Sequence, residues 1–266
     1  MGSIADFLEN ELLDHVCNAA YTPPATVYVG LSTADPTDSG GGLAEPSGNG
    51  YIRKAITFAA AASRQVAQNA DVNFNQASGA WGTITHWGTF DSESAGNMTA
   101  HGQLGTSKEV VSGNTPSVAS GEVTVSFSAG YISDYLANKL LDLAFRNQAY
   151  SAPDTYCALT TVIITDSMTG STITEHSGDG YARKQVNVNG GSSPTWDLAA
   201  SGIVDNTDNV DIGPATGAWG TVVALGIVDA AAAGNLLLYD NGVADQAVGD
   251  GDTVRFPAGD LDISMS

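Results

Sequence analysis

The pentapeptide GAWGT occupies Gly79–Thr83 and returns unchanged at Gly217–Thr221. Only four tryptophans occur in the 266 residues, so chance is a poor explanation for two identical stretches that each contain one. Both copies stand just before an apolar strand pattern, TITHWGTF in the first and TVVALGIV in the second. The pentapeptide therefore indicates that one structural unit is written twice.

The repetition extends through the rest of the chain. The offset between matching stretches is 128 residues near the start of each copy, 130 in the middle, and 138 from GAWGT onward. The other matching pairs are Ile4–Asp14 with Ile132–Asp142 and Gly50–Lys54 with Gly180–Lys184. The increase in offset predicts an eight-residue insertion in the second copy, around residues 187–202. We therefore predict two tandem domains, residues 1–129 and 130–266, each of ordinary domain size.

Each copy opens with an amphipathic helix pattern. Apolar residues recur every three or four positions from Ile4 to Val16, and the same stripe follows Ile132 in the second copy. A stripe of this kind covers a sheet edge of its own domain or docks on a neighbour. The candidate residues for self-assembly or docking on these helices are Phe7, Leu8, Tyr135 and Leu136.

The remainder of each copy has the pattern of short strands and turns. EVTVSF (Glu122–Phe127) and DLDISMS (Asp260–Ser266) alternate apolar and polar residues, as half-buried antiparallel strands do. Stretches rich in Gly, Asn, Asp and Pro separate these patterns and are typical of turns. We predict a mainly β fold of two tandem antiparallel β-sandwich or jelly-roll-like domains, each preceded by an amphipathic N-terminal α-helix.

The tryptophans of the pentapeptides suit a structural role. The first glycine of each GAWGT is expected to supply the positive φ of a turn, and the second to leave room for another backbone or ring. Trp81 and Trp219 would then face inward at the start of a strand. Recurrence in both copies favours a core anchor over a ring that stacks on a sugar.

Trp196 is different because it falls within the predicted insertion and has no counterpart in the alignment of the copies. It is the candidate exposed ring, and we include it among the candidate interaction residues. Together with Tyr51 it would carry the alternative function, binding of a host glycan.

The charge of the chain excludes several classes of partner. The net charge is −20, and the nine Lys and Arg residues do not cluster, which argues against binding to nucleic acid or to an anionic membrane. No apolar run reaches the roughly 18 residues that span a bilayer. Asp6, Glu9, Glu11 and Asp14 stand where a signal peptide would be apolar, so we expect synthesis in a host cytoplasm without standard export.

No catalytic motif or cofactor motif is found in the sequence. The four histidines lack metal-ligand spacing, and the carboxylates shared by the copies form no recognisable acid–base pair. The acidic stretches Asp205–Asp211 and Asp250–Asp252 offer oxygen ligands for calcium. Neither has EF-hand spacing, so solvated acidic loops are the favoured interpretation and no cofactor is predicted.

Several stretches together resemble a known family. LLDHV, AYTPPATVYVGLSTADPTD, GYIRKAITF, ASGAWGTITHWGTFD and GNMTAHGQL are similar to small virion structural proteins of tailed bacteriophages, described as tail-fibre-like or head-decoration-like. The second copy matches as a diverged repeat through LLD, AYSAPDTYCALT, GYARK, ATGAWGT and GNLLL. The resemblance implies a non-enzymatic particle component and brings no catalytic residues with it.

These observations favour a virion structural protein on the particle surface, either a capsid decoration or head fibre or a component of a tail fibre. Its expected partners are further copies of itself and other virion proteins, and symmetric assembly would be its mechanism. Host-glycan binding is the alternative. A glycan-degrading enzyme ranks last, since it requires two close carboxylates in a cleft.

Overall fold

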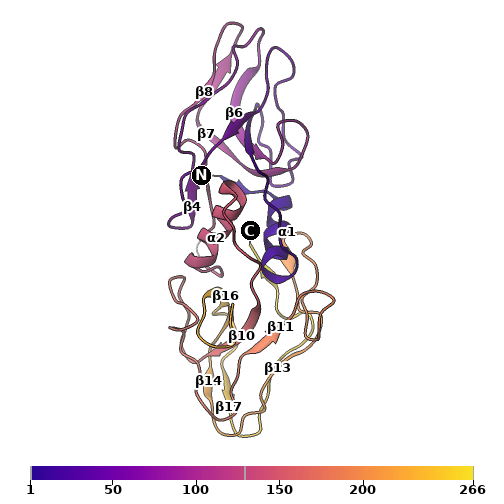
Figure 1. Cartoon of the computed structure of the whole chain (residues 1–266), viewed down its shortest axis with the longest axis vertical. Helices are drawn as coiled ribbons and strands as arrows, with labels where there is room; N and C mark the ends of the chain where they lie inside the picture. Colours follow the sequence, from indigo (N-terminus) through magenta and orange to yellow (C-terminus); the bar gives the residue numbers. More distant parts are fainter. Residues whose placement is uncertain (1, 129, 266) are drawn as a thin grey trace.

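The computed structural model describes residues 2–128 and 130–265. We refer to the first copy as repeat 1 and to the second as repeat 2. The molecule is elongated, with the β-strands of repeat 1 at one end and those of repeat 2 at the other (Figure 1). Both helices lie side by side at the waist, between the two β units.

The helices are α1 (Asp6–Cys17) and α2 (Asp134–Arg146). Both begin near the predicted positions. In α2 the Ser133 hydroxyl accepts a hydrogen bond from the backbone N–H of Leu136 at 3.1 Å and so caps the helix. The N-cap position of α1 is Ala5, which offers no side-chain cap.

Repeat 1 is built on a five-stranded antiparallel sheet in the order β1-β7-β6-β2-β3. Its strands are β1 (Ser3–Ile4), β2 (Val27–Ser32), β3 (Lys54–Ile56), β6 (Gly82–Phe90) and β7 (Met98–Val110). Two short ladders complete the unit: β4 (Gln65–Ala67) with β9 (Thr124–Ser126), and β5 (Val72–Asn73) with β8 (Ser117–Val118).

Repeat 2 has a four-stranded antiparallel sheet in the order β11-β10-β15-β16. Its strands are β10 (Thr155–Thr160), β11 (Lys184–Val186), β15 (Ala224–Val228) and β16 (Leu236–Asp240). The ladders are β12 (Ile203–Val204) with β19 (Ile263–Ser264), β13 (Val210–Ile212) with β18 (Val254–Phe256), and β14 (Gly220–Val222) with β17 (Gln246–Val248). The predicted mainly β class, with two tandem units each opened by a helix, is confirmed.

Strand register shows how the repeats correspond. Val27 pairs with Ile56 in repeat 1, as Thr155 pairs with Val186 in repeat 2. The isolated bridge between Phe58 and Gln68 recurs as the bridge between Trp196 and Asn206. The offset is therefore 130 at Val186 and already 138 at Trp196, so the extra residues lie between these two positions.

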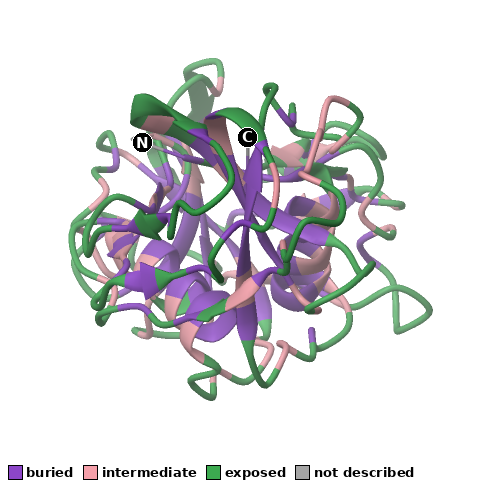
Figure 2. Ribbon diagram, turned by 90° about the horizontal axis from the view of Figure 1, so that it is seen from above, coloured by how far each residue is buried: buried purple, intermediate pink, exposed green. Residues whose placement is uncertain are grey.

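One hydrophobic core runs through both repeats. Buried residues concentrate toward the middle when the molecule is viewed along its length, and exposed residues form the periphery (Figure 2). A single cluster joins residues from both helices and both β units, among them Leu8, Leu12, Trp81, Leu136, Leu140 and Trp219. The repeats are therefore packed into one body.

The glycines of GAWGT have roles opposite to those predicted. The positive φ belongs to the second glycine, at +88° in Gly82 and +85° in Gly220. The first glycine allows close approach instead, because a Cβ at Gly79 would lie only 2.6 Å from the side chain of Asn49. Gly217 faces a similar approach in repeat 2.

The tryptophan between these glycines lies in the core of each repeat. Trp81 is 5% exposed and donates its indole N–H to the carbonyl of Asn49 at 3.0 Å. Trp219 is 3% exposed and donates to the carbonyl of Asp179 at 2.9 Å. Each ring thus fixes a preceding loop while it fills the interior.

Candidate functional site

The waist is held by equivalent contacts that cross between the repeats. Asp14 of α1 accepts a hydrogen bond from the backbone N–H of Ala199 in repeat 2 at 2.8 Å. Asp142 of α2 accepts one from the N–H of Ala61 in repeat 1, also at 2.8 Å. The two aspartates occupy matching helix positions, and the two alanines are 138 residues apart. Each helix therefore binds the partner repeat through the same pair of positions.

A second pair of equivalent hydrogen bonds also joins each helix to the other repeat. The side-chain oxygen of Asn10 accepts from the N–H of Gly202 at 2.9 Å, and that of Asn138 accepts from the N–H of Arg64 at 3.0 Å. Each helix also contacts its own repeat, α1 through β7 and α2 through β16. Reciprocal contacts between matching positions characterise an isologous dimer interface, here formed within one chain.

The matching positions Arg64 and Gly202 make the two halves of the waist chemically different. The Arg64 guanidinium pairs with Asp166 at 2.6 Å and also donates to the backbone carbonyl of Ser128. Gly202 has no side chain, and the carboxylate of Glu9 approaches it. Burial raises the pKa of Glu9, with Asp6 and Asp38 adding to the effect. The ion pairs on one side therefore have no equivalent on the other.

Trp196 does not lie on the surface, and the expectation that it is exposed is wrong. Its ring is fully buried, and its indole N–H donates to the hydroxyl of Thr155 at 2.8 Å. The reason is the true position of the insertion, which ends before Trp196 and leaves this residue in the place of Phe58. Phe58 packs edge-on against Phe145 of α2, with ring centroids 5.3 Å apart. Both residues are core positions at the waist.

The candidate residues on the helices divide into two groups. Leu8 and Leu136 are fully buried in the chain's own core, so they are not accessible to another molecule in this structure. Phe7 and Tyr135 are partly exposed. Contact of Phe7 and Tyr135 with a partner remains a prediction.

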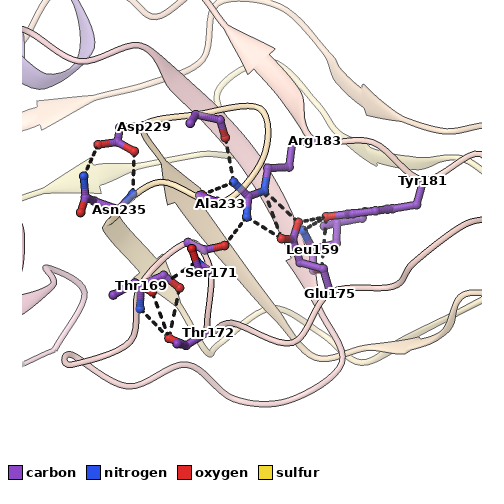
Figure 3. Close-up of polar contacts among 12 residues, drawn as sticks. Leu159, Thr169, Ser171, Thr172, Glu175, Tyr181, Arg183, Asp229, Ala233 and Asn235 are labelled. Carbon is purple, nitrogen blue, oxygen red and sulfur yellow. Dashed lines mark hydrogen bonds and ion pairs between the residues drawn. The ribbon is translucent and has the colours of Figure 1, made fainter.

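A partly buried carboxylate that sequence reasoning missed organises each β unit. In repeat 2 the Glu175 carboxylate accepts hydrogen bonds from the Tyr181 hydroxyl at 2.5 Å and from Arg183 at 2.6 Å (Figure 3). Arg183 also donates to the backbone carbonyls of Ala230 and Ala233, both at 2.7 Å. The guanidinium thus ties the loop between β15 and β16 to the rest of the unit.

Repeat 1 contains the same arrangement. Glu45 accepts from Tyr51 at 2.6 Å and from Arg53 at 2.6 Å, and Arg53 donates to the carbonyl of Ala95 at 2.6 Å. The available signal was that Glu45 precedes GYIRK by the same spacing at which Glu175 precedes GYARK. The Tyr51 ring is partly buried and its hydroxyl is engaged, so it suits loop fixation better than sugar stacking.

A cavity with a volume of about 530 Å³ lies in repeat 2. It lies between β16 and β19 and is lined by apolar, aromatic and acidic side chains. Beside it, Asp205 lies close to Asp262. A hydrogen bond with Asp262, burial, and the negative charges of Asp262 and Asp197 raise the pKa of Asp205 to about 6.

The acidic stretches proposed for calcium are used differently. Asp211 pairs with Arg255 at 2.6 Å, and Asp252 accepts a hydrogen bond from the backbone N–H of Gly249 at 2.8 Å. Within residues 2–128 and 130–265, no group of three or more His, Cys, Asp or Glu side chains is placed to hold a metal ion. In the same part of the chain, neither helix has the length and apolar character needed to cross a membrane.

Comparison with known proteins gives one family. The family model described as "Podophage GP4 fiber I protein gp80" matches the sequence twice, over residues 3–126 and 131–264. The two matches correspond to the two repeats seen in the structure. A search of curated proteins found no match.

Proposed function

Because the chain belongs to the podophage GP4 fiber I protein gp80 family, we propose that it works on the particle surface by docking and self-assembly, without catalysis. The family assignment makes the chain a phage fibre protein and a virion component. The docking, the homo-oligomerisation and the non-enzymatic mechanism are the parts that we propose. Attachment to the head, as a decoration or head fibre, and attachment to the tail are both compatible with this role.

The continuous core through the waist is the observation that carries the proposal. Two β units joined only by a linker would move independently, since interfaces between domains are small by default. Here the helices are buried between the units and fixed by reciprocal hydrogen bonds to Ala61 and Ala199. The elongated molecule is therefore held as one body, which suits a component that must span a fixed distance on a particle.

The distribution of charge supports a surface role. Three of the nine basic side chains, Arg53, Arg64 and Arg183, lie in ion pairs and are 4–9% exposed. Each of these arginines offsets the charge of one carboxylate, so the other side chains carry the whole net charge of −20. Mutual repulsion between such surfaces would keep assembled particles apart in solution.

Host-glycan binding loses its sequence-based support. Trp196 is buried, and the Tyr51 hydroxyl donates to Glu45. We therefore do not propose this function through either ring.

The proposal is tested on virions and on the purified protein. Mass spectrometry of purified particles should detect the chain, and electron microscopy with a specific antibody should place it on the head or the tail. Light scattering coupled to size-exclusion chromatography should find a mass above the 27.1 kDa of one chain. A protein absent from virions and strictly monomeric would contradict the proposal.

A further inference from the structure

The cavity of repeat 2 combines aromatic surface with negative charge. Its aromatic lining residues are Tyr131, Tyr239 and Phe256, and its acidic ones are Asp240, Asp260 and Asp262. None of the described residues that line it is Lys or Arg. Tyr131 is 67% exposed, which is unusual for an aromatic side chain at the mouth of an apolar cleft.

The equivalent space in repeat 1 is occupied by an indole ring. Trp87 takes the place of Leu225 and is 1% exposed. Gly102, which matches Asp240, makes room for it, because a Cβ there would lie 2.5 Å from the Trp87 ring. In repeat 2 the smaller Leu225 stands in place of Trp87, and the side chain of Asp240 takes the place of Gly102.

The segment ahead of the helix also differs between the two repeats. In repeat 1 the backbone N–H of Gly2 donates to the carbonyl of Thr124 at 2.8 Å, which joins β9 to the segment ahead of α1. In repeat 2 the matching segment contains Tyr131, whose φ is +57°. Val125 of β9 is fully buried, whereas its counterpart Ile263 of β19 is partly exposed.

We propose that this cleft, lined by Leu225, Phe256 and Asp240, is a docking site for a cationic peptide segment of another virion protein. The segment would insert an aromatic side chain between Leu225 and Phe256, and place a Lys or Arg beside the three aspartates. That the partner is a virion protein rests on the function proposed above. The chemistry of the segment rests on the cleft alone.

Both parts of this chemistry follow from what lines the cleft. Aromatic rings bury the most area when they enter an apolar pocket, and the cleft, with a volume of about 530 Å³, has room for one. A cation close to several carboxylates gains electrostatic attraction and a faster approach to the site. In a second copy of this chain, basic residues next to aromatic ones, such as Arg53 and Arg146, are already paired with carboxylates of the same copy, so a different protein is the better occupant.

The test uses the full chain and a defined probe, acetyl-Lys-(5-fluoro-Trp)-Lys-amide. Its fluorine resonance should broaden and shift on titration with the protein in low salt. A matched probe with Glu in place of both lysines should bind at least tenfold more weakly. Leu225→Trp, which restores the residue of repeat 1, should abolish binding. The volume-conserving control Leu225→Met should bind within twofold of the unchanged protein.

The double variant Asp240→Asn, Asp260→Asn provides a second route if Leu225→Trp fails to fold. It leaves the apolar lining intact and should weaken the lysine probe by at least tenfold. Equal binding of the two probes, binding undiminished in folded Leu225→Trp, or no binding by the unchanged protein would each overturn the proposal. Binding to a saccharide array that disappears in Leu225→Trp would show that the cleft binds a glycan, and would overturn the proposal of a peptide. Absence of the chain from virions would contradict the proposed function but leave probe binding unaffected.

Discussion

The exposure of single side chains indicates which ion pairs contribute to the stability of this fold. The Arg183 side chain is 4% exposed and pairs with Glu175, which is 15% exposed. The Arg255 pair with Asp211 has equally short contacts, but its side chains are 56% and 40% exposed. Removing one partner of a buried pair leaves an uncompensated charge, whereas an exposed partner is replaced by water.

We therefore predict that Arg183→Ala lowers the free energy of unfolding by about 3–5 kcal/mol. The loss has two causes, because Glu175 is left largely buried without its cation and the carbonyls of Ala230 and Ala233 lose their donor. Arg255→Ala is the matched control and should leave the urea midpoint unchanged within error. Equal midpoints for the two variants would show that the buried carboxylate does not organise repeat 2.

The carboxyl of Asp205 makes stability depend on pH. Its pKa is raised to about 6 in the folded chain, above the ordinary value of 3.8, so the folded state favours the protonated form. Its stabilising contribution is therefore complete below about pH 4 and is lost as pH rises through about 6. We predict that Asp205→Asn is more stable than the unchanged protein at pH 7.5, and that this advantage shrinks by pH 4.5. Urea titrations at pH 7.5 and pH 4.5 measure the difference in free energy of unfolding between the variant and the unchanged protein. A difference that is the same at both pH values would contradict the raised pKa of Asp205.

Predictions about single residues were correct where an apolar residue recurs in both copies. They failed where the position of a residue depends on the alignment of the two repeats. Burial of a large ring in both copies could be inferred from GAWGT alone. The place of Trp196 depends on whether the insertion ends before or after it, and only strand pairing with Asn206 fixes that. The role of Glu175 was equally hidden, since a glutamate in a glycine-rich stretch has the pattern of an exposed loop residue.

At the level of elements, the helices were predictable but their partners were not. The apolar stripes of α1 and α2 specify helices with a buried face. The groups that Asp14 and Asp142 bind are backbone N–H groups, which carry no sequence signature. The sequence therefore left open whether each helix covers its own repeat or a neighbour, and in the structure each does both.

We predict that Asp14→Ala and Asp142→Ala each lower the free energy of unfolding by about 1.5–3 kcal/mol, the range for hydrogen bonds to a charged group. Their effects should be similar because the two residues occupy matching positions. Lys139→Ala, on the exposed side of α2, is the control and should have little effect. A large loss from only one of the two aspartate variants would show that the two crossing contacts are not energetically equivalent.

The whole molecule behaves, on this reasoning, as a dimer whose two subunits are joined in one chain. Its waist has the reciprocal contacts of an isologous interface, and the continuous core passes through that waist. Covalent linkage adds a high effective concentration of one repeat for the other, but the contacts themselves do not need it. The differences between the repeats, such as Leu225 for Trp87, are then sites where one half has been free to diverge.

We predict that the repeats stay associated after the link between them is cut. A protease site inserted within residues 128–131 allows cleavage of the folded chain, and the two fragments should co-elute on size-exclusion chromatography at the volume of the uncut protein. Asp14→Ala combined with Asp142→Ala should promote their separation, because it removes two of the crossing hydrogen bonds. Cleavage followed by elution of two independent folded fragments would mean that the waist is an ordinary linker-dependent contact. Cleavage with complete co-elution would instead establish that one repeat recognises the other without help from the covalent bond.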